Sequence, residues 1–103
     1  MKHYDTIIVG AGPGGIFSAY ELKKKDPNRS VAVFETGHPL ERRRCPIDGE
    51  KINSCINCKS CSIMSGFGGA GAFSDGKYNI TNNFGGTLYE HIGKKRALDL
   101  MYY

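Results

Sequence analysis

The hydrophobic and polar positions of the first third of the chain change period twice. Residues 4–9, YDTIIV, form a short β-rich apolar run, which is typical of a strand buried on both faces of a parallel sheet. Residues 16–25, IFSAYELKKK, space their apolar side chains as an amphipathic helix does, and residues 26–28, DPN, end that helix. Residues 30–35, SVAVFE, predict a second strand. The order strand, helix, strand predicts the opening βαβ unit of an α/β, Rossmann-like fold over residues 1–35.

The regular pattern then stops for about forty residues. Residues 36–76 show no helical or strand period, and a segment of that length without periodicity is more often functional than idle. Residues 77–81, KYNIT, are a candidate strand, and residues 85–103 predict helix in two pieces around Gly93. No third parallel strand is evident. We therefore expect residues 1–103 to be the incomplete N-terminal part of a single larger domain. The expected packing partner of these residues is the remainder of the same polypeptide.

Composition and charge exclude some classes of function. The chain has 103 residues, 40% of them hydrophobic and 23% charged, and a net charge of +4. Its two basic clusters, at 23–25 and 42–44, are not interleaved with aromatic residues, so they predict solvated faces and no nucleic-acid partner. No apolar run approaches the roughly 18 residues of a membrane span, and the N-terminus lacks a signal-peptide pattern. We expect a cytoplasmic protein.

The segment between the first strand and the helix has the pattern GxGxxG. A glycine at position 10 permits a tight turn out of the strand, one at 12 lets a pyrophosphate approach the backbone, and one at 15 lets helix and strand pack closely. The helix N-terminus would direct unpaired N–H groups at the phosphates, and a proline lacking an N–H is tolerated there. The candidate phosphate-binding residues are Gly10, Gly12, Pro13, Gly14 and Gly15.

Glu35 ends the second strand about 20 residues after this motif, where a carboxylate can accept hydrogen bonds from both hydroxyls of an adenosine ribose. The same charge would repel a 2′-phosphate. These residues alone leave the choice between FAD and NAD open.

Several segments carry a resemblance to known flavoproteins. DTIIVGAGPGG at 5–15 and VAVFE at 31–35 resemble the opening of glutathione-reductase-like FAD-binding proteins. SGFGGAGAFSDGKYN at 65–79 and GGTLYEHIG at 85–93 resemble a family of large FAD-dependent dehydrogenases of bacteria and archaea, although Tyr78 stands where leucine is usual. The resemblance implies an FAD-dependent oxidoreductase with NAD(P)H as a candidate co-substrate. An NAD-binding dehydrogenase and a non-catalytic cysteine-rich metal-binding module remain as alternatives. The substrate and the catalytic residues are not readable here.

A second glycine-rich block is expected to pass close to the cofactor. Glycine and alanine permit such an approach, and their free N–H groups can bind flavin or phosphate oxygens. The candidates are Gly68, Gly69, Gly71 and Ala72. Arg42 follows Glu35 closely enough to reach the cofactor phosphates or the adenine, and it is a further candidate.

The Cys/Gly-rich segment at 45–76 contains all four cysteines of the chain. Cys55, Cys58 and Cys61 have CxxCxxC spacing, and Cys45 lies ten residues before the first of them. Four thiolates can hold zinc or an iron–sulfur cluster, and in a reducing compartment they favour ligation over disulfides. A redox-active dithiol and unliganded thiols are the alternatives. His3, His38 and His91 show no partner spacing.

Overall fold

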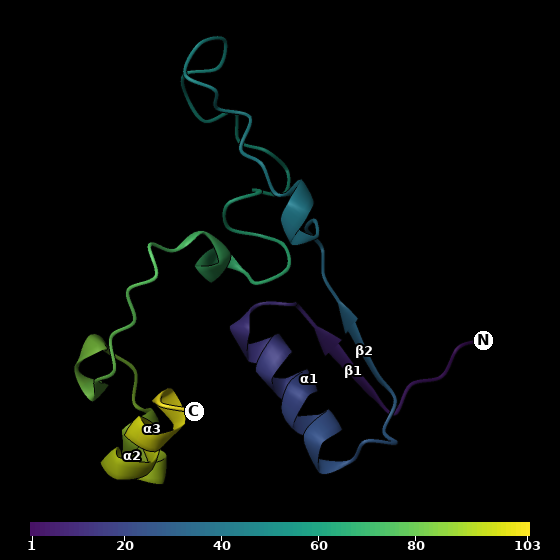
Figure 1. Cartoon of the computed structure of the whole chain (residues 1–103), viewed down its shortest axis with the longest axis vertical. Helices are drawn as coiled ribbons and strands as arrows, with labels where there is room; N and C mark the ends of the chain where they lie inside the picture. The colour runs from purple at the N-terminus through teal and green to yellow at the C-terminus, as the bar shows by residue number, and fades with distance from the viewer.

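The computed structural model describes residues 1–103. It opens with strand β1 (Thr6–Val9), helix α1 (Pro13–Lys25) and strand β2 (Val31–Phe34), which lie side by side in Figure 1. The two strands pair in parallel from Thr6↔Val31 to Val9↔Phe34. The predicted βαβ unit of an α/β, Rossmann-like fold is confirmed.

Local sequence explains the bounds of α1. Gly12 is the N-cap residue and Pro13 the first helical residue, where a missing N–H costs nothing. The last turn holds three lysines at 23–25, which complement the negative end of the helix dipole. Asp26 is the C-cap residue, and its N–H still donates to the Leu22 carbonyl oxygen at 2.9 Å.

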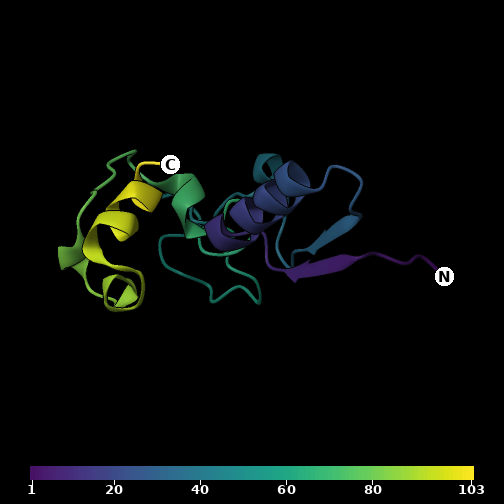
Figure 2. The ribbon, with the colours of Figure 1, turned by 90° about the horizontal axis from the view of Figure 1, so that it is seen from below.

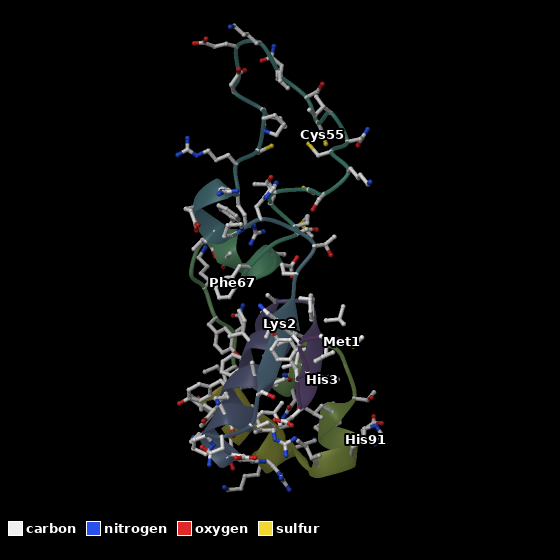
Figure 3. All side chains as sticks on the ribbon, turned by 90° about the vertical axis from the view of Figure 1, so that its right-hand side faces the viewer. Met1, Lys2, His3, Cys55, Phe67 and His91 are labelled. Carbon is white, nitrogen blue, oxygen red and sulfur yellow. The ribbon has the colours of Figure 1, made fainter.

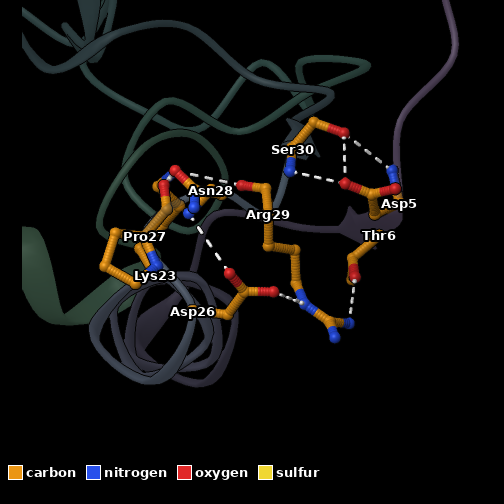
Figure 4. A network of polar contacts seen from close by, with 8 residues as sticks. All are labelled: Asp5, Thr6, Lys23, Asp26, Pro27, Asn28, Arg29 and Ser30. Atoms are coloured by element: carbon orange, nitrogen blue, oxygen red, sulfur yellow. Dashed lines mark hydrogen bonds and ion pairs between the residues drawn. The ribbon is translucent and has the colours of Figure 1, made fainter.

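A polar network fixes the connection from α1 back into β2 (Figure 4). The Asp5 carboxylate accepts hydrogen bonds from the Ser30 N–H at 2.7 Å and from its hydroxyl at 2.8 Å, and these bonds lower the pKa of Asp5. The Asp5 N–H donates to the same hydroxyl at 2.9 Å. Arg29 contacts Asp26 at 3.5 Å and the Thr6 hydroxyl at 3.4 Å. The amino ends of both strands are thereby held in register.

The middle of the chain contains two short 3₁₀ turns, η1 (Leu40–Arg42) and η2 (Ala70–Phe73), joined by the long cysteine-bearing loop at the top of Figure 1. The strand proposed for 77–81 is wrong: these residues are irregular, because no neighbouring strand is placed to pair with them. A third 3₁₀ turn, η3 (Asn82–Phe84), follows.

The C-terminal part is helical in two pieces, α2 (Leu88–Ile92) and α3 (Lys94–Met101), as predicted. Gly93 separates them with φ of 84°, a left-handed value that favours glycine. These helices lie to one side of the βαβ unit in a flat molecule (Figure 2). Tyr103, two residues beyond α3, contacts α1: its hydroxyl donates to Glu21 and accepts from Lys24, both at 2.5 Å.

The chain buries little of its surface. Its radius of gyration is 17.3 Å, against about 13 Å for a compact domain of this length. Ile7 and Val9 are 58% and 88% exposed, so the expectation of a strand buried on both faces is not met. Only the face toward α1 is covered, because no second layer packs on the other face. No helix of the structure has the length and apolar character needed to cross a membrane.

Arg43 is one of the few buried side chains, with 3% of its surface exposed. Its guanidinium donates to four main-chain carbonyls, those of Ser62, Ile63, Phe67 and Gly69, at 2.6 to 2.8 Å. The cation also lies 4.8 Å from the centre of the Phe73 ring. A buried charge is tolerated when it is hydrogen-bonded, and four of the five N–H donors of Arg43 are used. Arg43 thereby supplies the irregular segment with internal support that regular structure would otherwise give.

Replacement by alanine is expected to have opposite effects at two neighbouring glycines of α1, Gly14 and Gly15. A Cβ on Gly15 would lie 2.0 Å from the Gly10 carbonyl oxygen, whereas a Cβ on Gly14 meets nothing within 4 Å. We expect Gly15→Ala to destabilise the full-length protein by several kcal/mol, and Gly14→Ala to be neutral or stabilising by up to about 1 kcal/mol through helix propensity. Urea unfolding of both variants measures this. Equal stability of the two would contradict the close packing of α1 on β1.

Candidate functional site

The parallel pairing of β1 and β2 brings the glycine turn and Glu35 to the same edge of the sheet. Gly10 leaves β1 with φ of 99° and donates its N–H to the Phe34 carbonyl oxygen at 2.7 Å. That bond extends the ladder one residue beyond the strands. The carboxyl ends of parallel strands are where open α/β sheets bind their ligands.

The glycine turn presents free donors and free space. The N–H groups of Gly12, Gly14 and Gly15 donate to no acceptor in the chain, as is usual at a helix N-terminus. A Cβ built on Gly10, Gly12 or Gly14 meets nothing within 4 Å. The absent side chains therefore leave room above the backbone, while the glycine at 15 serves packing. An anion can approach the positive end of α1 there.

The Glu35 carboxylate is joined to this turn. One of its oxygens accepts the Ala11 N–H at 2.7 Å and the other accepts the Gly37 N–H at 2.9 Å. These bonds, led by that of Ala11, hold the pKa of Glu35 below its usual value, so the carboxylate is charged at neutral pH. An ionised carboxylate has about four acceptor positions. The Ala11 and Gly37 bonds occupy one position on each oxygen and leave acceptor capacity for a ligand hydroxyl.

A mainly apolar cavity of about 310 Å³ opens beside Glu35. It lies between α1, β2 and the second glycine-rich block, and its lining residues are Ala11, Ile16, Ala19, Val33, Glu35 and Phe67. The apolar walls of this cavity suit a flat ring, and the Glu35 carboxylate at its edge suits the hydroxyl groups of a polyol attached to that ring.

The second glycine-rich block packs against the first. The Gly68 N–H donates to the Ala11 carbonyl oxygen at 2.8 Å. A Cβ on Gly69 would lie 3.2 Å from the Gly12 Cα and 3.3 Å from the Pro13 Cδ. Sequence analysis placed this block near the cofactor, and the structure places it on the glycine turn itself. Gly71 and Ala72 lie in η2, just beyond this contact.

Sequence analysis missed the close approach between Gly37 and Gly66. A Cβ on Gly37 would meet the Gly66 main chain at 2.5 Å, and one on Gly66 would meet the His38 carbonyl oxygen at 2.6 Å. Phe67 donates its N–H to that same oxygen at 3.1 Å. The sequence offered one signal for this contact: Gly37 stands two residues after Glu35, and a glycine-rich block follows later in the chain.

The basic cluster at 42–44 was expected to form a solvated face, but Arg43 within it is buried. Arg42 is exposed and its side chain makes no hydrogen bond or ion pair in the structure, so its contact with a cofactor stays a prediction. Arg43 is the member that binds the second glycine-rich block, through the carbonyl oxygens of Phe67 and Gly69. No sequence signal separates the two, because burial of one arginine of three depends on where the loop folds back.

The four cysteines line one cavity of about 210 Å³, together with Pro46, Asn57 and Ser62 among others. All four thiols are exposed and free, and no group of three or more Cys, His, Asp or Glu side chains is arranged to hold a metal ion. Metal ligation by Cys45, Cys55, Cys58 and Cys61 stays a prediction. In Figure 3 His3 and His91 lie in the lower half of the view and Cys55 lies near the top, so neither histidine completes this group.

Cys61 differs from the other three thiols. Hydrogen bonds from the Met64 and Ile63 N–H groups, with a smaller effect of the Arg43 charge, lower the pKa of Cys61. Its carbonyl oxygen accepts the N–H groups of Met64 at 3.1 Å and Ser65 at 2.7 Å. Cys61 therefore begins a tight turn whose next two carbonyls are held by Arg43.

Comparisons with known proteins agree with this geometry. Residues 8–40 match the model of the NAD(P)-binding Rossmann-like domain, which covers the glycine turn, α1, β2 and Glu35. An uncharacterized protein of Clostridium beijerinckii is 37% identical over 71 residues, a match that spans 69% of this chain and 13% of the relative. No solved structure matches the chain.

The free N–H groups at the start of α1, the open space over Gly12 and the charged acceptor at Glu35 form one arrangement, and the matched residues contain all of it. The N-terminal βαβ unit of this chain has a Rossmann-like fold, and residues 8–40 are similar to NAD(P)-binding Rossmann-like domains.

Proposed function

We propose that this chain is the FAD-binding portion of a flavin-dependent oxidoreductase. The observation that carries the proposal is the Glu35 carboxylate, fixed at 2.7 Å from the Ala11 N–H beside a glycine turn with free donors. The pyrophosphate would lie over Gly12 at the start of α1. The two ribose hydroxyls would donate to Glu35, and the adenine would enter the cavity next to it.

The charge of Glu35 selects among dinucleotides. The glycine turn at 10–15 and Glu35 together are called the dinucleotide seat. A 2′-phosphate placed on the ribose would meet this carboxylate, and the two anions would repel each other. NADP is therefore disfavoured at this seat, while FAD and NAD both carry the free hydroxyls. NAD is the second candidate, supported by the description of the matching domain.

The second glycine-rich block supports FAD over NAD. This block, which resembles flavin-dependent dehydrogenases, donates the Gly68 N–H to the glycine turn and lies against Gly12. A flavin dinucleotide bound at the turn would lie beside it. When bound, FAD supplies the hydride or electron chemistry. The residues described here bind the dinucleotide, orient its ribose and bring free N–H groups to its phosphates.

The identity of the cofactor has a direct spectroscopic test. We expect the full-length protein, purified without added nucleotide, to show flavin absorbance bands near about 370 and 450 nm, with one FAD per chain released by heat denaturation. A colourless protein that binds NAD and not added FAD would replace this proposal with the NAD candidate. Binding of neither would remove both.

Gly12→Val separates folding from binding. Gly12 has φ of −75°, which any residue adopts, and a Cβ there meets nothing within 4 Å. We expect the variant to fold with wild-type circular dichroism and to lose FAD binding by about 100-fold or more, because the branched side chain fills the space that the pyrophosphate needs. Titration of the flavin-free protein with FAD measures the Kd. An unchanged Kd would place the pyrophosphate elsewhere.

Glu35→Gln tests the ribose contact with a change of almost no volume. The amide keeps one acceptor for the Ala11 N–H but loses the charge, the acceptor of the Gly37 N–H and the acceptor capacity that the hydroxyls use. We expect the Kd for FAD to rise by about 10-fold or more, since a hydrogen bond to a charged group contributes about 1.5–3 kcal/mol. Glu41→Gln is the matched control, because Glu41 is exposed in η1, away from the seat. Equal affinities of the two variants would contradict the role of Glu35.

A further inference from the structure

A continuous series of short contacts joins the cysteine cavity to the glycine turn. Cys61 and Ser62 line the cavity, and the Arg43 guanidinium binds the Ser62 carbonyl oxygen through Nε at 2.8 Å. Through Nη1 the same group binds the carbonyl oxygens of Phe67 and Gly69 at 2.7 and 2.8 Å. The residue between those two, Gly68, donates its N–H to Ala11.

The donors of Arg43 are directed at both ends of one segment. Nε and Nη2 hold the turn that begins at Cys61, and Nη1 holds the block that lies on Gly12 and Pro13. Because the guanidinium is planar and rigid, a shift of the cysteine turn cannot leave the glycine block in place without breaking a hydrogen bond. At 3% exposure, water cannot readily replace a broken bond.

We propose that Arg43 is a positioning residue that couples the dinucleotide seat to the Cys61 thiol, so that a covalent change at Cys61 changes the affinity of the seat. The inference rests on the proposed function, because it needs a dinucleotide at the glycine turn. The coupling is reciprocal: a bound dinucleotide holds the Gly66–Gly69 backbone in place and so restricts the turn at Cys61.

Alkylation of a single thiol tests the coupling in the full-length protein, stripped of metal with a chelator and reduced. One variant keeps only Cys61, through Cys45→Ser, Cys55→Ser and Cys58→Ser. The matched control keeps only Cys55, which lines the same cavity and whose thiol forms hydrogen bonds with Asn57 and not with the Arg43-bound turn. Iodoacetamide forms a carbon–sulfur bond to the thiolate and releases iodide.

We expect alkylation of the Cys61-only protein to raise the Kd for FAD by about fivefold or more, the lower end of typical coupling between sites. Alkylation of the Cys55-only protein should change the Kd by less than about twofold. Saturating FAD should in turn slow the alkylation of Cys61 and leave that of Cys55 unchanged. If Arg43 only stabilised the fold, none of these differences would be expected, because the alkylation rate of Cys61 would then not depend on bound FAD.

The Arg43→Lys variant of the Cys61-only protein keeps the charge but loses the rigid fork. We expect it to bind FAD with the effect of alkylation reduced below about twofold. The comparison of Cys61 with Cys55 decides the question even if this variant fails to fold. Normal FAD binding with no effect of Cys61 alkylation overturns the coupling alone. Failure of the unmodified protein to bind FAD overturns the proposed function and the coupling with it.

Discussion

The Arg43 guanidinium donates hydrogen bonds to four main-chain carbonyls while 97% of the residue's surface is hidden, and no carboxylate pairs with it. A charge in that position is stable only because carbonyl dipoles replace its water shell. The consequence extends beyond the arginine, since its acceptors belong to a segment that has no helix or strand of its own. Without this contact, the second glycine-rich block would be held to the rest of the chain mainly by the hydrogen bonds from the Gly68 N–H to Ala11 and from the Phe67 N–H to His38.

Glu35 has the corresponding role on the other side of the turn. Its two oxygens bind the main chain before α1 and after β2, so one carboxylate sets the distance between the two loops. The seat is thus built from backbone N–H groups whose positions are fixed by two charged side chains. Such a seat needs almost no deep core, which accords with a chain in which Ala11 and Ala97 are the buried apolar residues. The exposed apolar face of β1 and β2 contributes nothing to it.

The glycines explain why these loops can meet at all. Gly37 and Gly66 approach each other within distances that no Cβ would permit, and Gly69 rests on Gly12. Close backbone approach shortens the path between the cysteine cavity and the nucleotide seat. Coupling between the two is therefore a matter of a few hydrogen bonds, and not of a long relay through packed side chains.

The amino-acid sequence by itself determined the βαβ unit, the position of its glycine turn, the place of Glu35 at the end of the second strand and the break at Gly93. Each of these depends on local periodicity, on a turn that only glycine tolerates, or on a fixed spacing along adjacent parallel strands. Tertiary structure alone decided that Arg43 and not Arg42 is buried, that Gly66 meets Gly37, and that residues 77–81 do not pair as a strand. These outcomes depend on contacts between segments about twenty or more residues apart, where loop closure and the availability of a partner determine the structure and local preference does not.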